Sequence, residues 1–126
     1  MKITRLAAAA VLAGSLALGT ALPAQAATGE QRAALAQATS YVRILDISKA
    51  ALYDQLHSRY GGQFSKKAAH YGANHVKANW NREALAAARS YRRILHLSRA
   101  ALREQLVSEY GGQFTGSQAD YALKHL

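Results

Sequence analysis

The 126-residue sequence contains no cysteine, which excludes disulfide bridges, thiolate zinc sites and a cysteine nucleophile. Its single proline and 9 glycines exclude collagen-like chains and proline-rich linkers. Acidic residues are also few, with 7 Asp and Glu against 16 Lys and Arg, so the formal net charge is +9. Half of the residues are apolar, mostly Ala and Leu, which predicts a folded helical chain rather than a disordered one.

Residues 1–26 have the three parts of a secretory signal peptide. Lys2 and Arg5 form a basic start, an apolar stretch rich in Ala and Leu follows, and Ala24–Ala26 supplies the small residues that signal peptidase requires. The apolar stretch is short for a membrane span, which needs about 20 strongly apolar residues, and no comparable stretch follows. We therefore expect a secreted bacterial protein, outside the cytoplasm, whose mature chain has no transmembrane segment and a charge of about +7.

The mature chain repeats itself after 50 residues. Residues 31–76 match residues 81–126 at about 25 of 46 positions, and the pentapeptide Tyr-Gly-Gly-Gln-Phe occurs in both halves. We therefore predict two repeats, 27–78 and 79–126, each too small to bury much apolar surface alone.

Each repeat is predicted to contain three helices. In the first repeat, the apolar spacing predicts helices over residues 31–45 and 49–60, and a third that starts at Lys66. No proline interrupts residues 66–95, so the third helix is expected to run into the second repeat, with a bend at Asn79–Asn81. The predicted fold class is therefore all-α: two tandem three-helix repeats of helix-turn-helix-like shape, joined by a long connecting helix.

A set of positions that recurs in both repeats is expected to hold the fold together. Leucines one turn apart face the core, serines cap the second helix, glycines in the left-handed conformation close it, and phenylalanines pin the following turn. Thr115 and Gln118 predict a capping box that Ser65 lacks, and Trp80 is expected to pack where the repeats meet. The recurring positions are Ser48, Leu52, Leu56, Tyr60, Gly61, Phe64, Tyr71, Ser98, Leu102, Leu106, Tyr110, Gly111, Phe114 and Tyr121.

The helix-turn-helix outline and the basic charge are also typical of DNA-binding proteins. The second repeat, however, does not keep the basic residues Lys66, Lys67 and His70 of the first repeat's third helix. A tandem DNA-reading protein would keep that face in both repeats, and export places the chain away from DNA. Sequence-specific nucleic-acid binding is therefore not expected.

Catalytic and metal-binding sets are not predicted either. Only His75 and His125 recur among the histidines, and neither has a partner at the helical spacing of metal ligands in both repeats. No Ser/His/Asp set recurs, and the Gly-Gly-Gln tripeptide is interpreted as part of a turn. We expect no catalytic residues, no metal, no cofactor and no enzymatic activity.

Five arginines crowd the first two predicted helices of the second repeat. One interpretation is a solvated basic surface. The other is electrostatic attachment to an anionic polymer, a phospholipid or a partner protein. These residues are Arg89, Arg92, Arg93, Arg99 and Arg103.

The recurring motifs resemble those of the Ltp family of host cell surface-exposed lipoproteins, which prophages often carry. The resemblance implies a tandem of small three-helix units and superinfection exclusion, in which a resident prophage's surface protein stops a second phage from delivering its DNA. Family members typically have a lipobox cysteine, which this sequence lacks, so we expect release from the cell or retention by charge. The stretches that carry the resemblance are Ala38–Tyr41, Ser48–Phe64, Ala69–Tyr71, Ala88–Tyr91, Ser98–Phe114 and Ala119–Ala122.

Together these features predict a non-catalytic exported binding module, associated with the cell surface, whose partner is a protein. A component of an incoming phage's DNA-injection apparatus is the partner that the resemblance implies. The alternative function is a cationic secreted envelope protein that binds anionic wall polymer or the membrane surface. High salt would disrupt the second kind of binding, because exposed charges are screened within about 8 Å at physiological ionic strength.

Overall fold

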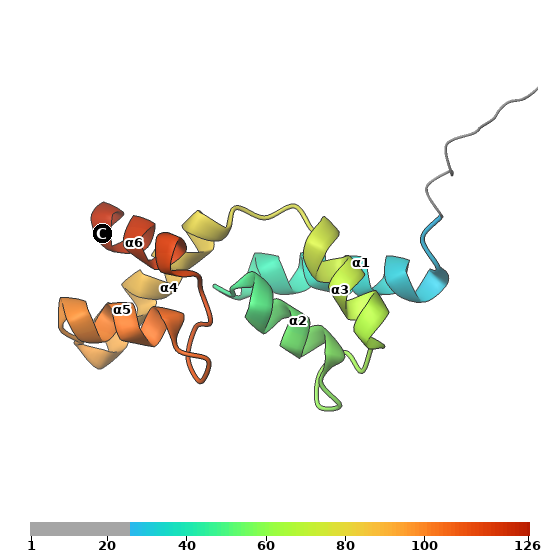
Figure 1. Ribbon diagram of the computed structural model, residues 1–126, viewed down its shortest axis with the longest axis horizontal. Helices are drawn as coiled ribbons and strands as arrows, with labels where there is room; N and C mark the ends of the chain where they lie inside the picture. Colours follow the sequence, from blue (N-terminus) through green and yellow to red (C-terminus); the bar gives the residue numbers. More distant parts are fainter. Residues whose placement is uncertain (1–25) are drawn as a thin grey trace, which may run out of the picture.

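The computed structural model describes residues 26–126, so the predicted signal peptide lies outside the described residues except for Ala26. The described part forms six α-helices and no strand, which confirms the predicted all-α fold of two three-helix repeats (Figure 1). The helices are α1 (Gly29–Ile44), α2 (Lys49–His57), α3 (Lys66–His75), α4 (Trp80–Leu95), α5 (Arg99–Val107) and α6 (Gly116–His125).

Each repeat buries its own core of leucines and alanines. In the first repeat, Leu52 and Leu56 of α2 are fully buried against alanines of α1 and α3. The backbones of α1 and α3 approach closely at Gly72. A Cβ added there would lie only 2.9 Å from the carbonyl oxygen of Ala34. Small residues therefore bring the outer helices together, and the leucines of the middle helix fill the space beneath them.

The second helix of each repeat begins at the predicted serine. The hydroxyls of Ser48 and Ser98 accept hydrogen bonds from backbone N–H groups of the first helical turn, at 3.1 and 3.2 Å. The predicted end of this helix is wrong, because α2 ends at His57, three residues early. Ser58 takes an extended conformation there, and its hydroxyl accepts a hydrogen bond from the N–H of Tyr60, which turns the chain away from the helix.

The third helices are capped differently in the two repeats. Thr115 and Gln118 form the predicted capping box at the start of α6. In the first repeat, Glu30 of α1 replaces the missing partner: its carboxylate accepts hydrogen bonds from the N–H and hydroxyl of Ser65, at 2.8 and 2.9 Å. These bonds, the backbone one first, hold the pKa of Glu30 below its usual range.

The predicted long connecting helix between the repeats is absent. Helix α3 ends at His75, and the chain runs in extended form through Val76 to Asn79 before α4 begins (Figure 1). The side-chain oxygen of Asn79 accepts a hydrogen bond from the N–H of Arg82 at 3.1 Å and so caps α4. A helix cannot continue through a residue that serves as the N-cap of the next one, because the N-cap backbone is not helical.

The repeats meet where α4 begins. Trp80 packs against the core of the first repeat, which confirms its predicted place at the junction. One turn later, the Glu83 carboxylate accepts a hydrogen bond from the N–H of Ile47, at 3.2 Å. Burial raises the pKa of Glu83 above its usual range despite the lowering effect of this hydrogen bond, and the neighbouring Asp46 charge adds to the rise.

Candidate binding surfaces

Both repeats carry the same tight turn between their second and third helices. In the first repeat, the N–H of Gly62 bonds to the carbonyl of Gln55 at 3.0 Å, and the N–H of Phe64 bonds to that of Leu56 at 2.9 Å. The second repeat makes the same two bonds 50 residues later, at 3.0 and 2.8 Å. The two turns are therefore clamped to the ends of α2 and α5 in the same conformation.

The glycines of these turns act differently from the prediction. Gly61 and Gly111 do not take the left-handed conformation; Gln63 and Gln113 do, with φ of 57° and 58°. Glycine is required for space instead, because a Cβ at Gly61 would lie 2.2 Å from the carbonyl oxygen of Gln55. The close return of the turn onto the helix end thus selects glycine.

The turns present a tyrosine to solvent in each repeat. The side chains of Tyr60 and Tyr110 are 91% and 92% exposed, although the sequence groups both tyrosines with the structural positions. Their N–H groups bond to the hydroxyls of Ser58 and Ser108, at 3.0 and 3.1 Å, which holds the turn backbone in place. In Figure 1 both turns project from the same, lower edge of the molecule.

The other recurring positions lie mainly in or beside the cores. Leu102, Leu106 and Phe114 are buried in the second core, and Phe64 packs against the first. Tyr71 and Tyr121 each stack on the histidine four residues later, with ring centroids 4.0 Å apart. His75 and His125 thus pair with aromatic rings at the helix ends, a role that their recurrence could have indicated.

A cavity of about 410 Å³ opens between the repeats, with a mixed polar and apolar lining. The Gln113 amide donates a hydrogen bond to the Asp54 carboxylate at 3.1 Å there, and joins the turn of the second repeat to α2. The remaining lining residues supply no recurring acid–base or nucleophilic set. They are Lys49, Ala50, Tyr53, His70, Ala73, Asn74, Thr115 and Gln118.

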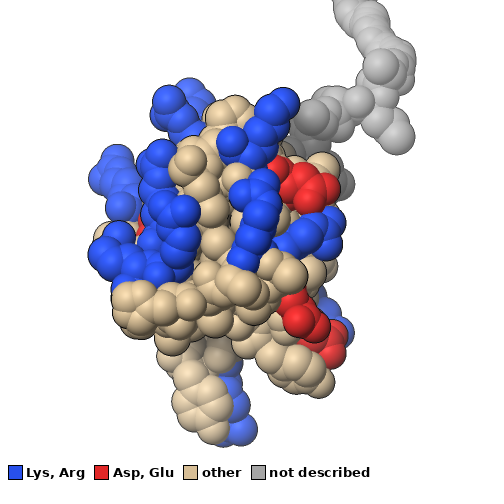
Figure 2. Space-filling view, turned by 90° about the vertical axis from the view of Figure 1, so that its left-hand side faces the viewer, with Lys and Arg blue, Asp and Glu red and all other residues tan. Residues whose placement is uncertain are grey.

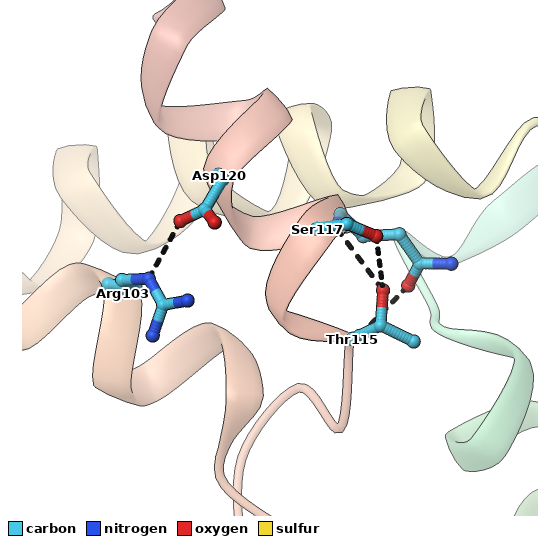
Figure 3. Close-up of polar contacts among 5 residues, drawn as sticks. Arg103, Thr115, Ser117 and Asp120 are labelled. Atoms are coloured by element: carbon cyan, nitrogen blue, oxygen red, sulfur yellow. Dashed lines mark hydrogen bonds and ion pairs between the residues drawn. The ribbon is translucent and has the colours of Figure 1, made fainter.

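The predicted basic residues lie at the exposed end of the second repeat. Figure 2 looks at this end and shows many Lys and Arg side chains and few Asp and Glu. Arg103 pairs with Asp120 of α6, Nε to Oδ1 at 2.8 Å (Figure 3). It therefore differs from the other four predicted arginines, which form no ion pair within the described residues. The hydrogen bond from Arg103 lowers the pKa of Asp120, and the same contact raises that of Arg103. Arg89, Arg92, Arg93 and Arg99 are exposed.

Within residues 26–126, no three His, Cys, Asp or Glu side chains come together in a way that could hold a metal ion. No helix of this part combines the length and apolar character needed to cross a bilayer. The two tyrosine turns and the basic end are the exposed candidate binding surfaces of this part of the chain.

Paired helical repeats that present identical turns define a tandem-repeat, all-α class of protein. The family model of host cell surface-exposed lipoproteins matches residues 29–76 and, separately, residues 79–126, and the chain belongs to this family. The family description agrees with a place outside the cytoplasm, at the cell surface.

A solved structure shares this fold. It is that of Ltp, a superinfection exclusion protein from the Streptococcus thermophilus temperate phage TP-J34. The two chains superpose with a TM-score of 0.73 and are 34% identical, over 80% of this chain and 99% of that one. No curated protein matches the chain.

Proposed function

We propose that the protein is a non-catalytic, exported binding module that acts in superinfection exclusion and blocks DNA entry by a second phage. The observation that carries this proposal is the similarity to the Ltp superinfection exclusion protein, which extends through both repeats at 34% identity. In this proposal residues 1–26 direct export, and residues 27–78 and 79–126 are the two repeat domains.

The partner in this proposal is a protein, a component of the incoming phage's DNA-injection apparatus, and the two tyrosine turns contact it. An exposed tyrosine offers a large amphipathic surface, and aromatic residues are enriched among the residues that dominate protein–protein affinity. The turns are already held by hydrogen bonds to the helix ends, so little conformational freedom is lost on binding. Two identical turns would engage a partner at two points, which raises the overall affinity.

The test is to display the mature chain on the surface of a susceptible bacterium and challenge it with a broad panel of phages. The proposal predicts that at least one phage still adsorbs normally, while its plating efficiency and DNA entry fall sharply. A displayed but unfolded variant such as Leu106→Asp serves as the control for display itself. Unchanged plating and unchanged DNA entry across the whole panel would contradict the proposal.

A further inference from the structure

The corner between the first two helices contacts the other repeat in the first repeat and, within the described residues, has no such contact in the second. In the first repeat this corner faces the second repeat: the Ser90 hydroxyl donates to the Asp46 carboxylate at 3.4 Å, and the N–H of Ile47 bonds to Glu83. The capping serines differ in the same way: Ser48 is only 1% exposed, whereas its counterpart Ser98 is exposed. Nothing in the described chain covers the corner of the second repeat.

The corner of the second repeat exposes two large aliphatic side chains, as does that of the first, where Ile44 is 77% and Leu45 41% exposed. Ile94 and Leu95, the last residues of α4, are 67% and 51% exposed and lie outside the core. Exposed apolar side chains that adjoin at a protruding corner mark an interaction site more often than scattered ones do. In Figure 1 this corner lies at the left end of the molecule, away from the two turns.

Positive charge surrounds this corner and exceeds that at the corner of the first repeat. Arg92 and Arg93 precede the aliphatic pair and Arg99 follows it, and all three are exposed. At the matching positions the first repeat has Val42, Arg43 and Lys49, and its corner carries the acidic Asp46 where the second repeat has a histidine. Within the described residues, the one ion pair engages Arg103, so none of these three arginines has an acidic partner.

We propose that this corner docks on the surface of an anionic phospholipid bilayer. Ile94 and Leu95 enter the boundary between head groups and acyl chains, and the arginines bind the lipid phosphates. A bilayer satisfies both features, because it offers an apolar phase directly beneath a layer of negative charge. An anionic wall polymer would use the arginines alone, and leave the aliphatic pair in water. This docking does not depend on phage exclusion and leaves the tyrosine turns free.

The test measures sedimentation of residues 27–126, which contain all six helices, with lipid vesicles at about 0.15 M salt. We expect binding to phosphatidylcholine vesicles that contain about one third phosphatidylglycerol, and little binding to pure phosphatidylcholine. Ile94→Ser should weaken binding about five- to tenfold, and Arg92→Gln with Arg93→Gln should weaken it further. Ile44→Ser is the matched control, because Ile44 is 77% exposed at the same position of the first repeat and should be dispensable.

Two results would overturn the proposal. One is the absence of binding to the anionic vesicles. The other is binding that Ile94→Ser leaves unchanged and that inorganic polyphosphate matches in affinity, which would identify a polymer-binding surface that uses charge alone. Both aliphatic side chains are exposed, so circular dichroism should show that the variants keep the helical fold.

Discussion

Arg103 and Asp120 form an ion pair, 2.8 Å from Nε to Oδ1 (Figure 3), at the position where the first repeat stacks two rings. In the first repeat the equivalent residues are Tyr53 and His70, whose ring centroids lie 4.1 Å apart. Both pairs join the second helix of a repeat to its third. The duplicated units therefore keep a common core but use different chemistry to join the same two helices.

Salt should weaken the ion pair and leave the ring stacking unchanged. A double-mutant cycle with Arg103→Ala and Asp120→Ala should give a small coupling free energy that shrinks in 1 M NaCl, where charges are screened within about 3 Å. The matching cycle with Tyr53→Ala and His70→Ala should give a coupling that salt leaves unchanged, because ring stacking does not depend on an ion pair. Equal salt dependence of the two cycles, measured by urea unfolding, would contradict this assignment.

Truncation of a core leucine should destabilise the protein strongly. Leu56 and Leu106 are fully buried, so Leu56→Ala or Leu106→Ala should lower the free energy of unfolding by about 2–5 kcal/mol. Ile44→Ala provides an exposed control and should change it by less than about 0.5 kcal/mol. Urea unfolding followed by circular dichroism measures both, and a buried-leucine effect as small as the control would mean that the helix faces are wrong.

Any side chain placed at the turn glycines should destabilise the protein, not only a β-branched one. Gly61→Ala should lower the free energy of unfolding by at least about 1 kcal/mol, because its Cβ would meet the carbonyl oxygen of Gln55. Gly116→Ala is the control: its Cβ would meet only the flexible end of Arg103 at 3.3 Å, so stability should stay the same or rise slightly. If Gly61→Ala left the free energy of unfolding unchanged, the turn would have room to relax.

Glu83 should make stability depend on pH at the junction between the repeats. Its pKa is raised in the folded state, so folding favours the protonated form and this group becomes destabilising as pH rises above the unfolded pKa. Glu83→Gln keeps an oxygen for the N–H of Ile47 without the charge. The variant should therefore gain stability over the wild type between about pH 4 and 7.

Thermal unfolding of both proteins across this pH range checks the prediction. Glu30 and Asp120 have lowered pKa values and act with the opposite sign, but they are present in both proteins and cancel in the comparison. A difference between wild type and Glu83→Gln that does not change with pH would show that Glu83 titrates normally.

Features set by neighbouring residues could be predicted from the sequence. The serine caps at Ser48 and Ser98 and the capping box at Thr115 follow from hydrogen bonds within one helical turn, and the structure contains them. The buried leucines follow from helical spacing in the same way. The duplication supports these predictions, because the same motif occurs in both repeats.

Features set by distant contacts could not be predicted. Glu30 caps Ser65 across 35 residues, and the requirement for glycine at Gly61 depends on how closely the turn returns to α2. The helix breaks at residues 76–79, which include no proline or glycine. It breaks there because Asn79 serves as the N-cap of α4. The exposure of Tyr60 and Tyr110, which defines the candidate surface, is likewise a property of the packed turn.

Phage DNA entry into bacteria that display equal amounts of two variants tests directly whether the tyrosine turns act in exclusion. Tyr60→Ala with Tyr110→Ala removes both exposed rings without touching the cores, and Tyr60→Phe with Tyr110→Phe keeps the rings as a control. We expect the alanine variant to admit phage DNA, and the wild type and the phenylalanine variant to exclude it. Exclusion that persists without both rings, or that the wild type never shows, would contradict this expectation.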